Sequence, residues 1–332
     1  MSPMHSTAIA DHLAESQAEG RLLVPRTDLE RRAIHRQVQK GTIAEPYPGM
    51  FAEPHAWEAT PWKDQATIVI RTYADQHPGH VFCLHTAAFL QGLWVPKHRV
   101  TGSLHVVGGR TGNSGRCVMH RVDCDPVATE SGLLVTPLQR TALDCMKTLD
   151  FRNGLAVADS LLKLEGVGSA EATARFGREF AGHRGIRRCR HILSHADARS
   201  DNGGESYARG VMIENGVMLP ELQVEVERLD RRGRPYRVDY LWDLPDGSKV
   251  AGELDGFEKT ESKEMLAGRT MNQVYRAERI RESQVTALGI PVLRFTFDMA
   301  VRTRPLLDQI DLFGIPRETY TQDARGEENV HH

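Results

Sequence analysis

Three acidic residues and one lysine fall in a short segment whose pattern predicts a β-hairpin. Asp239, Glu253 and Asp255 lie in residues 236–259, and Lys259 ends that segment. A buried carboxylate is costly unless it is paired or binds a cation. Converging acids beside a lysine are the groups that metal-dependent cleavage of a phosphodiester uses. The alternative is a solvated acidic face on an edge hairpin.

The turn of this hairpin determines which acids face each other. Leu244-Pro-Asp-Gly suits a three-residue hairpin loop, with proline and aspartate in a type I turn and glycine in the left-handed position. Such a loop pairs Leu244 with Ser248. Counting back along both strands then pairs Asp239 with Glu253, at roughly 4.5–5.5 Å between Cβ atoms. Asp255 lies two residues beyond Glu253 and shares its face, whereas a loop longer or shorter by one residue would move Asp239 to the other face.

The residues around the hairpin predict the rest of an α/β (α+β) domain. A helix is expected to begin near Ser200, with Glu205 in its first turn, and to stop at Asn215-Gly216. Alternating apolar residues predict a strand over 222–226. After the hairpin we expect a polar helix over 262–287, a strand over 289–297 and a closing helix over 298–310.

This order of elements, with the motif Val-Asp239-x13-Glu253-x-Asp255-Gly-x2-Lys259, resembles the restriction-endonuclease-like superfamily. The closest branch is the group of uncharacterised proteins related to very-short-patch repair endonucleases. The resemblance implies an αβββαβ core that hydrolyses phosphodiester bonds with Mg²⁺. It implies that Asp239 and Glu253 are metal ligands with Asp255 as a third acid, and that Glu205 and Lys259 complete the catalytic set. Asp255 departs from the superfamily pattern, because the standard motif has lysine at that position.

Several of these residues also have a structural interpretation. Lys259 is equally well explained as a surface lysine, and Glu205 as a favourable charge in the first turn of a helix. Arg276, in the expected polar helix, can contact a phosphate or pair with a neighbouring glutamate. The spacing does not separate these alternatives.

The N-terminal residues predict a second, smaller domain. Helices over 5–19 and 27–40 are expected, followed by a hairpin. Two helices and a hairpin make a winged-helix module whose second helix enters the major groove of DNA. Arg31, Arg32 and Arg36 supply positive charge on that helix. The alternative is a structural cap, because winged helices also bind proteins.

The front half resembles bacterial proteins that carry an AbiEi-type antitoxin winged-helix domain. The resemblance lies in the hairpin and in the stretches His85–Leu93 and Thr136–Asp144. It implies a transcriptional autoregulator of a toxin–antitoxin pair from phage defence, with a cognate toxin as partner. Arg140 and Asp144 lie four residues apart on an expected helix, which indicates a structural ion pair.

Length and composition are those of an ordinary globular protein with two or three domains. The chain has 332 residues, of which 40% are hydrophobic and 26% charged. No segment approaches the ~18 apolar residues of a membrane span, and the first residues lack the pattern of a signal peptide. Five scattered cysteines and fifteen histidines show no zinc spacing. We therefore expect reduced thiols and a cytoplasmic location.

The net charge of −2 requires that any DNA binding come from local patches. One such patch is the basic run 175–199, which includes Arg187 and Arg188. We expect a solvated linker there, with phosphate contact as the alternative.

The expected domains are a winged helix (1–60), an α/β middle domain with the basic linker (61–198), the endonuclease-like domain (199–312) and a flexible tail (313–332). The favoured function is a DNA-binding protein with Mg²⁺-dependent endonuclease activity. The alternative is an antitoxin and autoregulator whose nuclease fold has lost catalysis.

Overall fold

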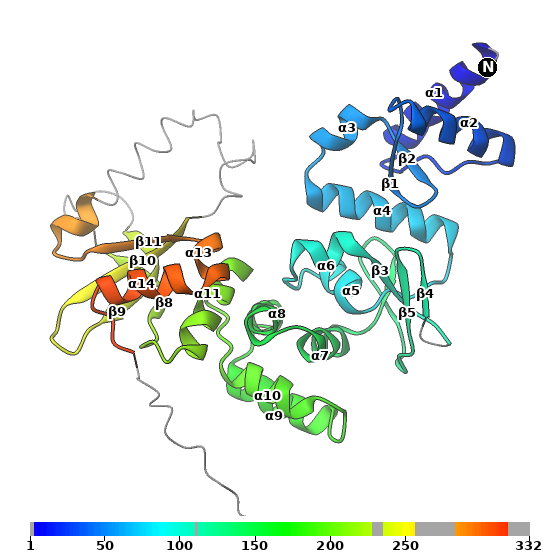
Figure 1. Ribbon diagram of the computed structural model, residues 1–332. Coiled ribbons are helices and arrows are strands. Elements are labelled where there is room, and N and C mark those ends of the chain that lie inside the picture. Colours follow the sequence, from blue (N-terminus) through cyan, green and yellow to red (C-terminus); the bar gives the residue numbers. More distant parts are fainter. Residues whose placement is uncertain (1–2, 110–111, 228–234, 256–282, 318–332) are drawn as a thin grey trace, which may run out of the picture. The chain divides into compact units, whose positions relative to one another are not determined.

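Mixed helices and sheets, α/β as expected, make up the computed structural model (Figure 1). The structure describes residues 3–109, 112–227, 235–255 and 283–317. The chain divides into two units, residues 1–145 and 146–332, and we describe each by itself. The domain boundary expected at residue 199 lies inside the second unit.

The first unit begins with two helices and a hairpin. These are α1 (Pro3–Ala18), α2 (Asp28–Gln39), β1 (Ala44–Tyr47) and β2 (Met50–Ala52), and the two strands are antiparallel. Thr27 caps α2, because its hydroxyl accepts the backbone N–H of Glu30 at 3.1 Å. Leu23, Ile34 and Phe51 are fully buried in a small core between these elements. The predicted helices and hairpin are confirmed, and the winged-helix assignment stays a prediction.

The rest of the first unit packs helices against a small mixed sheet. Its elements are α3 (Pro54–Ala59), α4 (Trp62–Gln76), α5 (Leu84–Leu90), α6 (Lys97–Gly102), β3 (Leu104–Val107), β4 (Gly112–Ser114), β5 (Cys117–His120), β6 (Val127–Ala128) and β7 (Leu134–Val135). β5 lies between β3, which is parallel to it, and β4, which is antiparallel. Ile70, Phe82 and Val106 form the centre of the apolar core. In α7 (Leu138–Thr148), Arg140 Nε lies 2.8 Å from Asp144 Oδ2, so the predicted ion pair is confirmed.

The second unit begins with the last residues of α7, 146–148, and continues with four helices. They are α8 (Phe151–Glu165), α9 (Ser169–Glu179), α10 (Ile186–Ser194) and α11 (Gly203–Glu214). α8 packs closely along α11, since a Cβ added at Gly210 would lie 3.0 Å from the Cα of Arg152. The run 175–199, expected as a solvated linker, forms the end of α9 and all of α10 instead. The linker prediction failed because the buried residues Phe176 and Ile192 give these basic helices an apolar side.

A four-stranded sheet follows, in the order β11-β10-β9-β8. Its strands are β8 (Glu221–Val226), β9 (Tyr236–Asp243), β10 (Lys249–Asp255) and β11 (Val292–Thr296), with β11 parallel to β10 and the other pairs antiparallel. α11, α13 (Phe297–Arg302) and α14 (Arg304–Leu312) share a core with this sheet that includes Tyr240, Trp242 and Leu293 (Figure 1). The strands predicted over 222–226 and 289–297 are confirmed. The single closing helix expected over 298–310 is divided by Thr303, whose φ is 65°.

Most of the polar helix predicted over 262–287 lies outside the described residues. Within the described part of the chain, no helix is long and apolar enough to cross a membrane.

Candidate functional site

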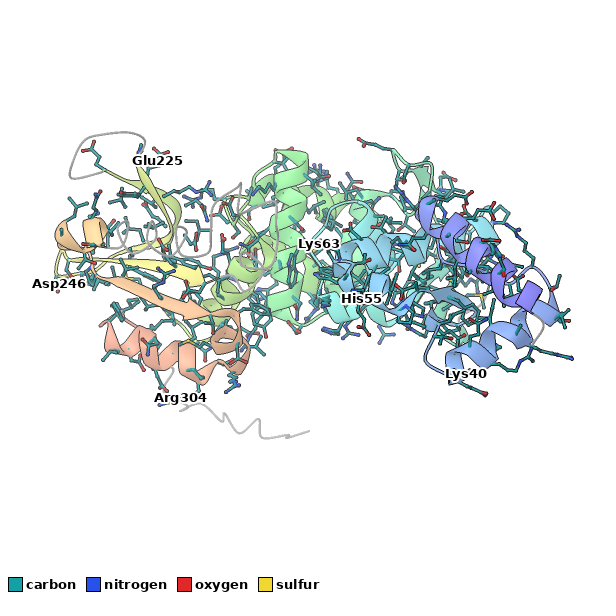
Figure 2. The ribbon with its side chains drawn as sticks, turned by 90° about the horizontal axis from the view of Figure 1, so that it is seen from above. Lys40, His55, Lys63, Glu225, Asp246 and Arg304 are labelled. Carbon is teal, nitrogen blue, oxygen red and sulfur yellow. The ribbon has the colours of Figure 1, made fainter. Side chains whose placement is uncertain are left out.

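The turn of the β9–β10 hairpin has the geometry that its residues predict. The backbone N–H of Leu244 donates to the carbonyl of Ser248 at 2.8 Å, and Gly247 has a left-handed φ of 84°. Asp246 lies at the tip of this hairpin (Figure 2) and accepts the backbone N–H of Ser248 at 2.9 Å. These contacts close the three-residue loop.

The hairpin register brings the predicted acids together. The antiparallel ladder runs to the pair formed by Gly252 and Tyr240, and one further step along it sets Asp239 beside Glu253. At that step Asp239 Oδ2 accepts the backbone N–H of Leu254 at 3.0 Å. The predicted register is confirmed, and one carboxylate oxygen of Asp239 is anchored to the neighbouring strand.

Glu205 lies in the first turn of α11, as predicted. Asn202 caps this helix, because its Oδ1 accepts the backbone N–H groups of Gly204 and Glu205 at 2.8 and 3.1 Å. The Glu205 carboxylate accepts the backbone N–H of Asp201 at 2.8 Å and the Asn202 side-chain amide at 2.5 Å. Such reciprocal bonds resemble a capping box, so Glu205 has the structural role that its position in the first turn suggests.

A glutamine joins the helix-borne acid to the strand-borne acid. Gln223 Nε2 donates to Glu205 Oε2 at 2.9 Å and to Asp239 Oδ1 at 3.4 Å. Gln223 has a left-handed φ of 55°, which is uncommon for a residue with a side chain. Nothing in the sequence singles out Gln223, because an alternating strand pattern does not indicate a left-handed backbone at a glutamine.

The carboxylates lie at the boundary between two apolar clusters that pack against the sheet. Leu222 and Tyr240 pack in the core that α11 shares, whereas Val224 and Val238 pack in a second cluster. On a flat strand, residues two positions apart would lie on one face. The change therefore occurs at the row of the sheet that contains Asp239, at the seam between the two clusters.

Two acids of this group are buried, and burial shifts the pKa of Glu205. Glu205 is 4% exposed and Glu253 is 7% exposed. Burial, and then the negative charge of Asp239, raises the pKa of Glu205 to about 7, although the hydrogen bonds from Asp201 and Gln223 act in the opposite direction. A bound cation would favour the ionised form of Glu205 and would release its proton.

Asp255 faces an arginine. The parallel register of β10 and β11 pairs Glu253 with Arg294, and Arg294 Nε donates to Asp255 Oδ1 at 3.0 Å. The residue at the usual lysine position is therefore engaged in an ion pair. Arg294 brings a positive charge next to Glu253, which no local pattern in the sequence indicates.

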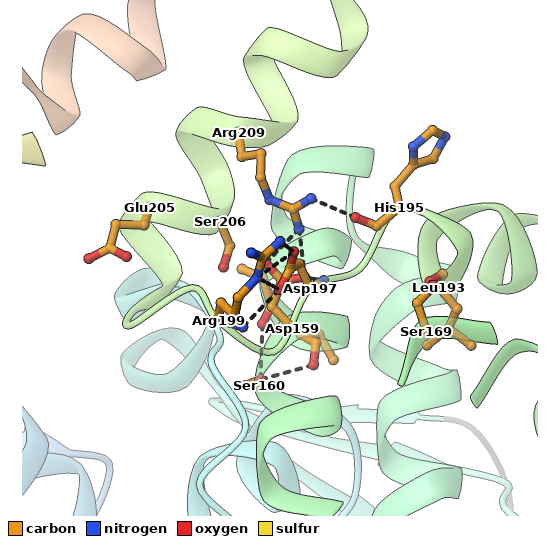
Figure 3. A network of polar contacts seen from close by, with 12 residues as sticks. Asp159, Ser160, Ser169, Leu193, His195, Asp197, Arg199, Glu205, Ser206 and Arg209 are labelled. Atoms are coloured by element: carbon orange, nitrogen blue, oxygen red, sulfur yellow. Dashed lines mark hydrogen bonds and ion pairs between the residues drawn. The ribbon is translucent and has the colours of Figure 1, made fainter. Parts of the chain in front are cut away.

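The orientation of α11 depends on a buried ion pair one turn after Glu205 (Figure 3). Arg209 donates to both carboxylate oxygens of Asp159 in α8, at 2.8 and 2.9 Å, and to the carbonyl of His195 at 2.7 Å. Asp159 is 2% exposed and Arg209 is 5% exposed. Burial raises the pKa of Asp159 against the opposing effect of the Arg209 charge. This pair ties the helix that carries Glu205 to α8.

The predicted nucleic-acid contacts fall in both units. Arg31, Arg32 and Arg36 are exposed on α2, in the first unit. Arg187 is exposed on α10, in the same unit as the acids.

Arg188 has a different environment from Arg187. Its Nε donates to the carbonyl of Met146 at 3.2 Å, and its guanidinium also donates to the carbonyl of Leu149, so it satisfies carbonyls at the end of α7. Lys259 and Arg276 lie outside the described residues.

Among the described residues, no three acidic, histidine or cysteine side chains converge as a ready-made metal site. Two carboxylates, from Glu205 and Asp239, do approach one amide. Mg²⁺ takes oxygen ligands and usually keeps several waters, so one or two carboxylates suffice to hold it. The donor set at this seam fits Mg²⁺.

Three histidines of the first unit form a line of hydrogen bonds. His85 Nδ1 lies 3.5 Å from His105 Nε2, and His105 Nδ1 lies 2.8 Å from His120 Nε2. His105 uses both ring nitrogens, so the three side chains do not converge on one point. Burial lowers the pKa of His85 to about 3 and that of His105 to about 4. A structural role for these histidines fits this arrangement.

No family model matches the chain, and no solved structure matches it. Two uncharacterised proteins of Mycobacterium tuberculosis, one from strain CDC 1551 / Oshkosh and one from strain ATCC 25618 / H37Rv, are each 32% identical to the chain over 183 residues. The similarity covers 54% of this chain, and the chain spans 64% of the length of these relatives. The descriptions of these relatives assign no activity.

Proposed function

We propose that the protein binds DNA and that its second unit is a Mg²⁺-dependent endonuclease, which hydrolyses phosphodiester bonds. The observation that carries the proposal is the approach of Glu205 and Asp239 to one amide, in the sheet row where Glu253 neighbours Asp239. Buried acids that gather in this way are stabilised when they share a cation.

Each acid has a distinct part in holding the cation. Asp239 and Glu253 would be its protein ligands, with Glu205 beside them. Asp239 accepts the backbone N–H of Leu254 with one oxygen, and its other oxygen accepts from Gln223 Nε2 at 3.4 Å. Mg²⁺ supplies, when bound, a nucleophilic water near neutral pH and neutralises charge on the attacked phosphate.

Arg294 would provide the positive charge that the lysine of the standard motif provides. Its guanidinium, opposite Glu253 in the sheet, is suited to contact a non-bridging phosphate oxygen. Fixed positive charge at that place stabilises the negative charge that develops during phosphoryl transfer.

Binding to DNA is assigned to the exposed arginines. Arg31, Arg32 and Arg36 on α2, and Arg187 on α10, are available for phosphate contacts. Phosphate contacts give sequence-independent affinity that falls with salt. The Arg36→Ala variant should weaken binding in a gel shift and reduce the slope of log affinity against log salt by about 1. Binding that depends on neither Arg36 nor salt would contradict a phosphate contact by α2.

Incubation of the purified protein with supercoiled plasmid and Mg²⁺ or Mn²⁺ tests the enzyme. We expect nicked or linear plasmid with the native chain and none with Asp239→Ala or Glu253→Ala. Asp298→Ala is the matched control, because Asp298 is an exposed acid of the same unit that pairs with Arg302. Cleavage that is absent, or that persists in the first two variants, would show the enzyme assignment to be wrong. DNA binding without cleavage would favour the alternative of an autoregulator with an inactive nuclease fold.

A further inference from the structure

We propose that Gln223 belongs to the cation site, where its side-chain Oε1 is an oxygen ligand for a divalent cation. The inference rests on the proposed function, since it concerns the same group of acids. It adds a neutral ligand from β8 to the carboxylates of α11, β9 and β10.

The sheet register puts Gln223 in the row of the acids. On β8 and β9 the pairs Leu222–Tyr240 and Val224–Val238 flank it, so Gln223 lies opposite Asp239. Asp239 in turn neighbours Glu253 on β10. One row across three adjacent strands therefore carries the glutamine and two acids.

The backbone of Gln223 is held in an unfavourable conformation. Its φ of 55° lies in the left-handed region, which is sterically unfavourable for a residue with a Cβ. Such conformations persist where the surrounding structure requires them, and they occur often at functional sites. Here the side chain meets Glu205 and Asp239 together.

Only one end of the Gln223 side-chain amide forms hydrogen bonds in the described part of the chain. Nε2 donates to the two carboxylates, whereas Oε1 is buried and has no hydrogen-bond partner in the described part of the chain. A buried acceptor without a partner costs free energy. The amide therefore has an oxygen ligand to offer within the acid cluster.

The charges around Gln223 determine whether the N–H or the oxygen end of its amide faces the acids. Beside two carboxylates the positive end, N–H, is favoured, as the structure has it. A cation held by the same carboxylates reverses the preference, because it attracts the amide oxygen and repels the N–H. Rotation of the amide about its terminal bond exchanges the two ends without moving the backbone.

A purely structural role for Gln223 makes the opposite prediction about cation binding. If the amide only donates hydrogen bonds to Glu205 and Asp239, a cation can take over that role. Removal of the amide would then leave cation affinity unchanged or would increase it. If Oε1 is a ligand, removal of the amide lowers the affinity.

Mn²⁺ binding to the full-length protein, measured by titration calorimetry or by electron paramagnetic resonance, separates these roles. We expect Gln223→Met, which keeps the side-chain length, to weaken Mn²⁺ binding about tenfold or more. Gln223→Glu, which restores an oxygen, should bind Mn²⁺ at least as tightly as the native chain. Gln284→Met is the matched control, because Gln284 is an amide of the same unit that accepts a hydrogen bond from Tyr236 at 2.8 Å.

Circular dichroism and thermal melting without Mn²⁺ verify that each variant folds, and Gln223→Ala replaces the methionine variant should that fail. Affinity that is unchanged or higher in the folded variant lacking the amide, but lost in Asp239→Ala, would overturn the role of Gln223 and leave the proposed function intact. A native chain that binds no Mn²⁺ would overturn both.

Discussion

Arg294 lies opposite Glu253 in the parallel register of β11 and β10, and its guanidinium donates to Asp255 two residues further along β10. A positive side chain from β11 thus lies beside two acidic residues of β10. Asp255 forms an ion pair with that arginine.

Replacing Arg294 should impair catalysis rather than cation binding. We expect Arg294→Met to slow plasmid cleavage about 100-fold, because fixed charge near the developing oxyanion is typically worth that much. Mn²⁺ affinity should not fall, since the variant removes a positive charge beside the acids. Arg294→Lys should recover part of the rate.

The control for Arg294 is Arg302→Met, which removes an exposed arginine paired with Asp298 on α13. It should cleave plasmid at the native rate. A native rate in Arg294→Met would show that the phosphate takes its positive charge from elsewhere.

The packing of the core next to Glu253 requires glycine at position 252. A Cβ at this position would lie 2.6 Å from the Trp242 ring and 3.2 Å from the Tyr240 side chain. We therefore expect Gly252→Ala to destabilise the second unit by about 1–3 kcal/mol, as overpacking does. The change in fluorescence of the fully buried Trp242 during denaturant unfolding measures this loss.

Gly168→Ala serves as the comparison for Gly252, because nothing lies within 4 Å of a Cβ at that position in the same unit. It should change stability by much less. Equal effects of the two substitutions would mean that the Trp242 contact is relieved by a small shift.

The buried pair of Asp159 and Arg209 should be costly to break. Arg209→Met leaves the Asp159 carboxylate buried without its partner, which typically costs about 3–5 kcal/mol. The double variant Asp159→Leu with Arg209→Met should recover much of that loss, because an apolar pair needs no charge compensation. Chemical denaturation of the four chains of this cycle gives the coupling energy.

An exposed pair of the same unit provides the contrast. Arg304 and Asp308 on α14 lie 2.7 Å apart, with side chains that are 80% and 54% exposed. Arg304→Met should cost less than about 1 kcal/mol. A similarly small cost for Arg209→Met would mean that water reaches Asp159.

Acid should destabilise the first unit through its line of histidines. The pKa of His85 is lowered to about 3 and that of His105 to about 4, from 6.5, so the unfolded chain binds more protons between pH 6.5 and 4. Their contribution to stability is complete above pH 6.5 and is lost as the pH falls through 4 to about 3. Calorimetry over this range should show a falling Tm, with a shallower fall in His105→Gln.

His55→Gln is the matched histidine control, because His55 is exposed on α3 (Figure 2). Its pH dependence should equal that of the native chain. A native slope in His105→Gln as well would assign the acid sensitivity to other groups.

Local chemistry in the sequence predicts the hairpin well. Leu244-Pro-Asp-Gly determines a loop length, and the loop length determines the register that sets Asp239 beside Glu253. Capping residues likewise predict the starts of α2 and α11. These features depend on residues close in the chain, where backbone preferences act directly.

Turn and capping preferences do not predict contacts between segments that are distant in the chain. The basic run 175–199 was expected as a linker, but its helices pack with α8, and α8 packs with α11. The bond between Arg209 and Asp159 joins residues fifty positions apart. The local sequence around these residues does not indicate which distant segment they contact.

The sequence by itself determined which acids share a face, because strand alternation and turn length are local rules. Only the tertiary structure decided which side chains meet them: the Gln223 amide, which donates to Glu205 and Asp239, and the Arg294 guanidinium, which donates to Asp255. The physical reason is that hydrogen bonds and charge pairs of a site act through space, between strands and helices whose arrangement depends on packing of the whole unit.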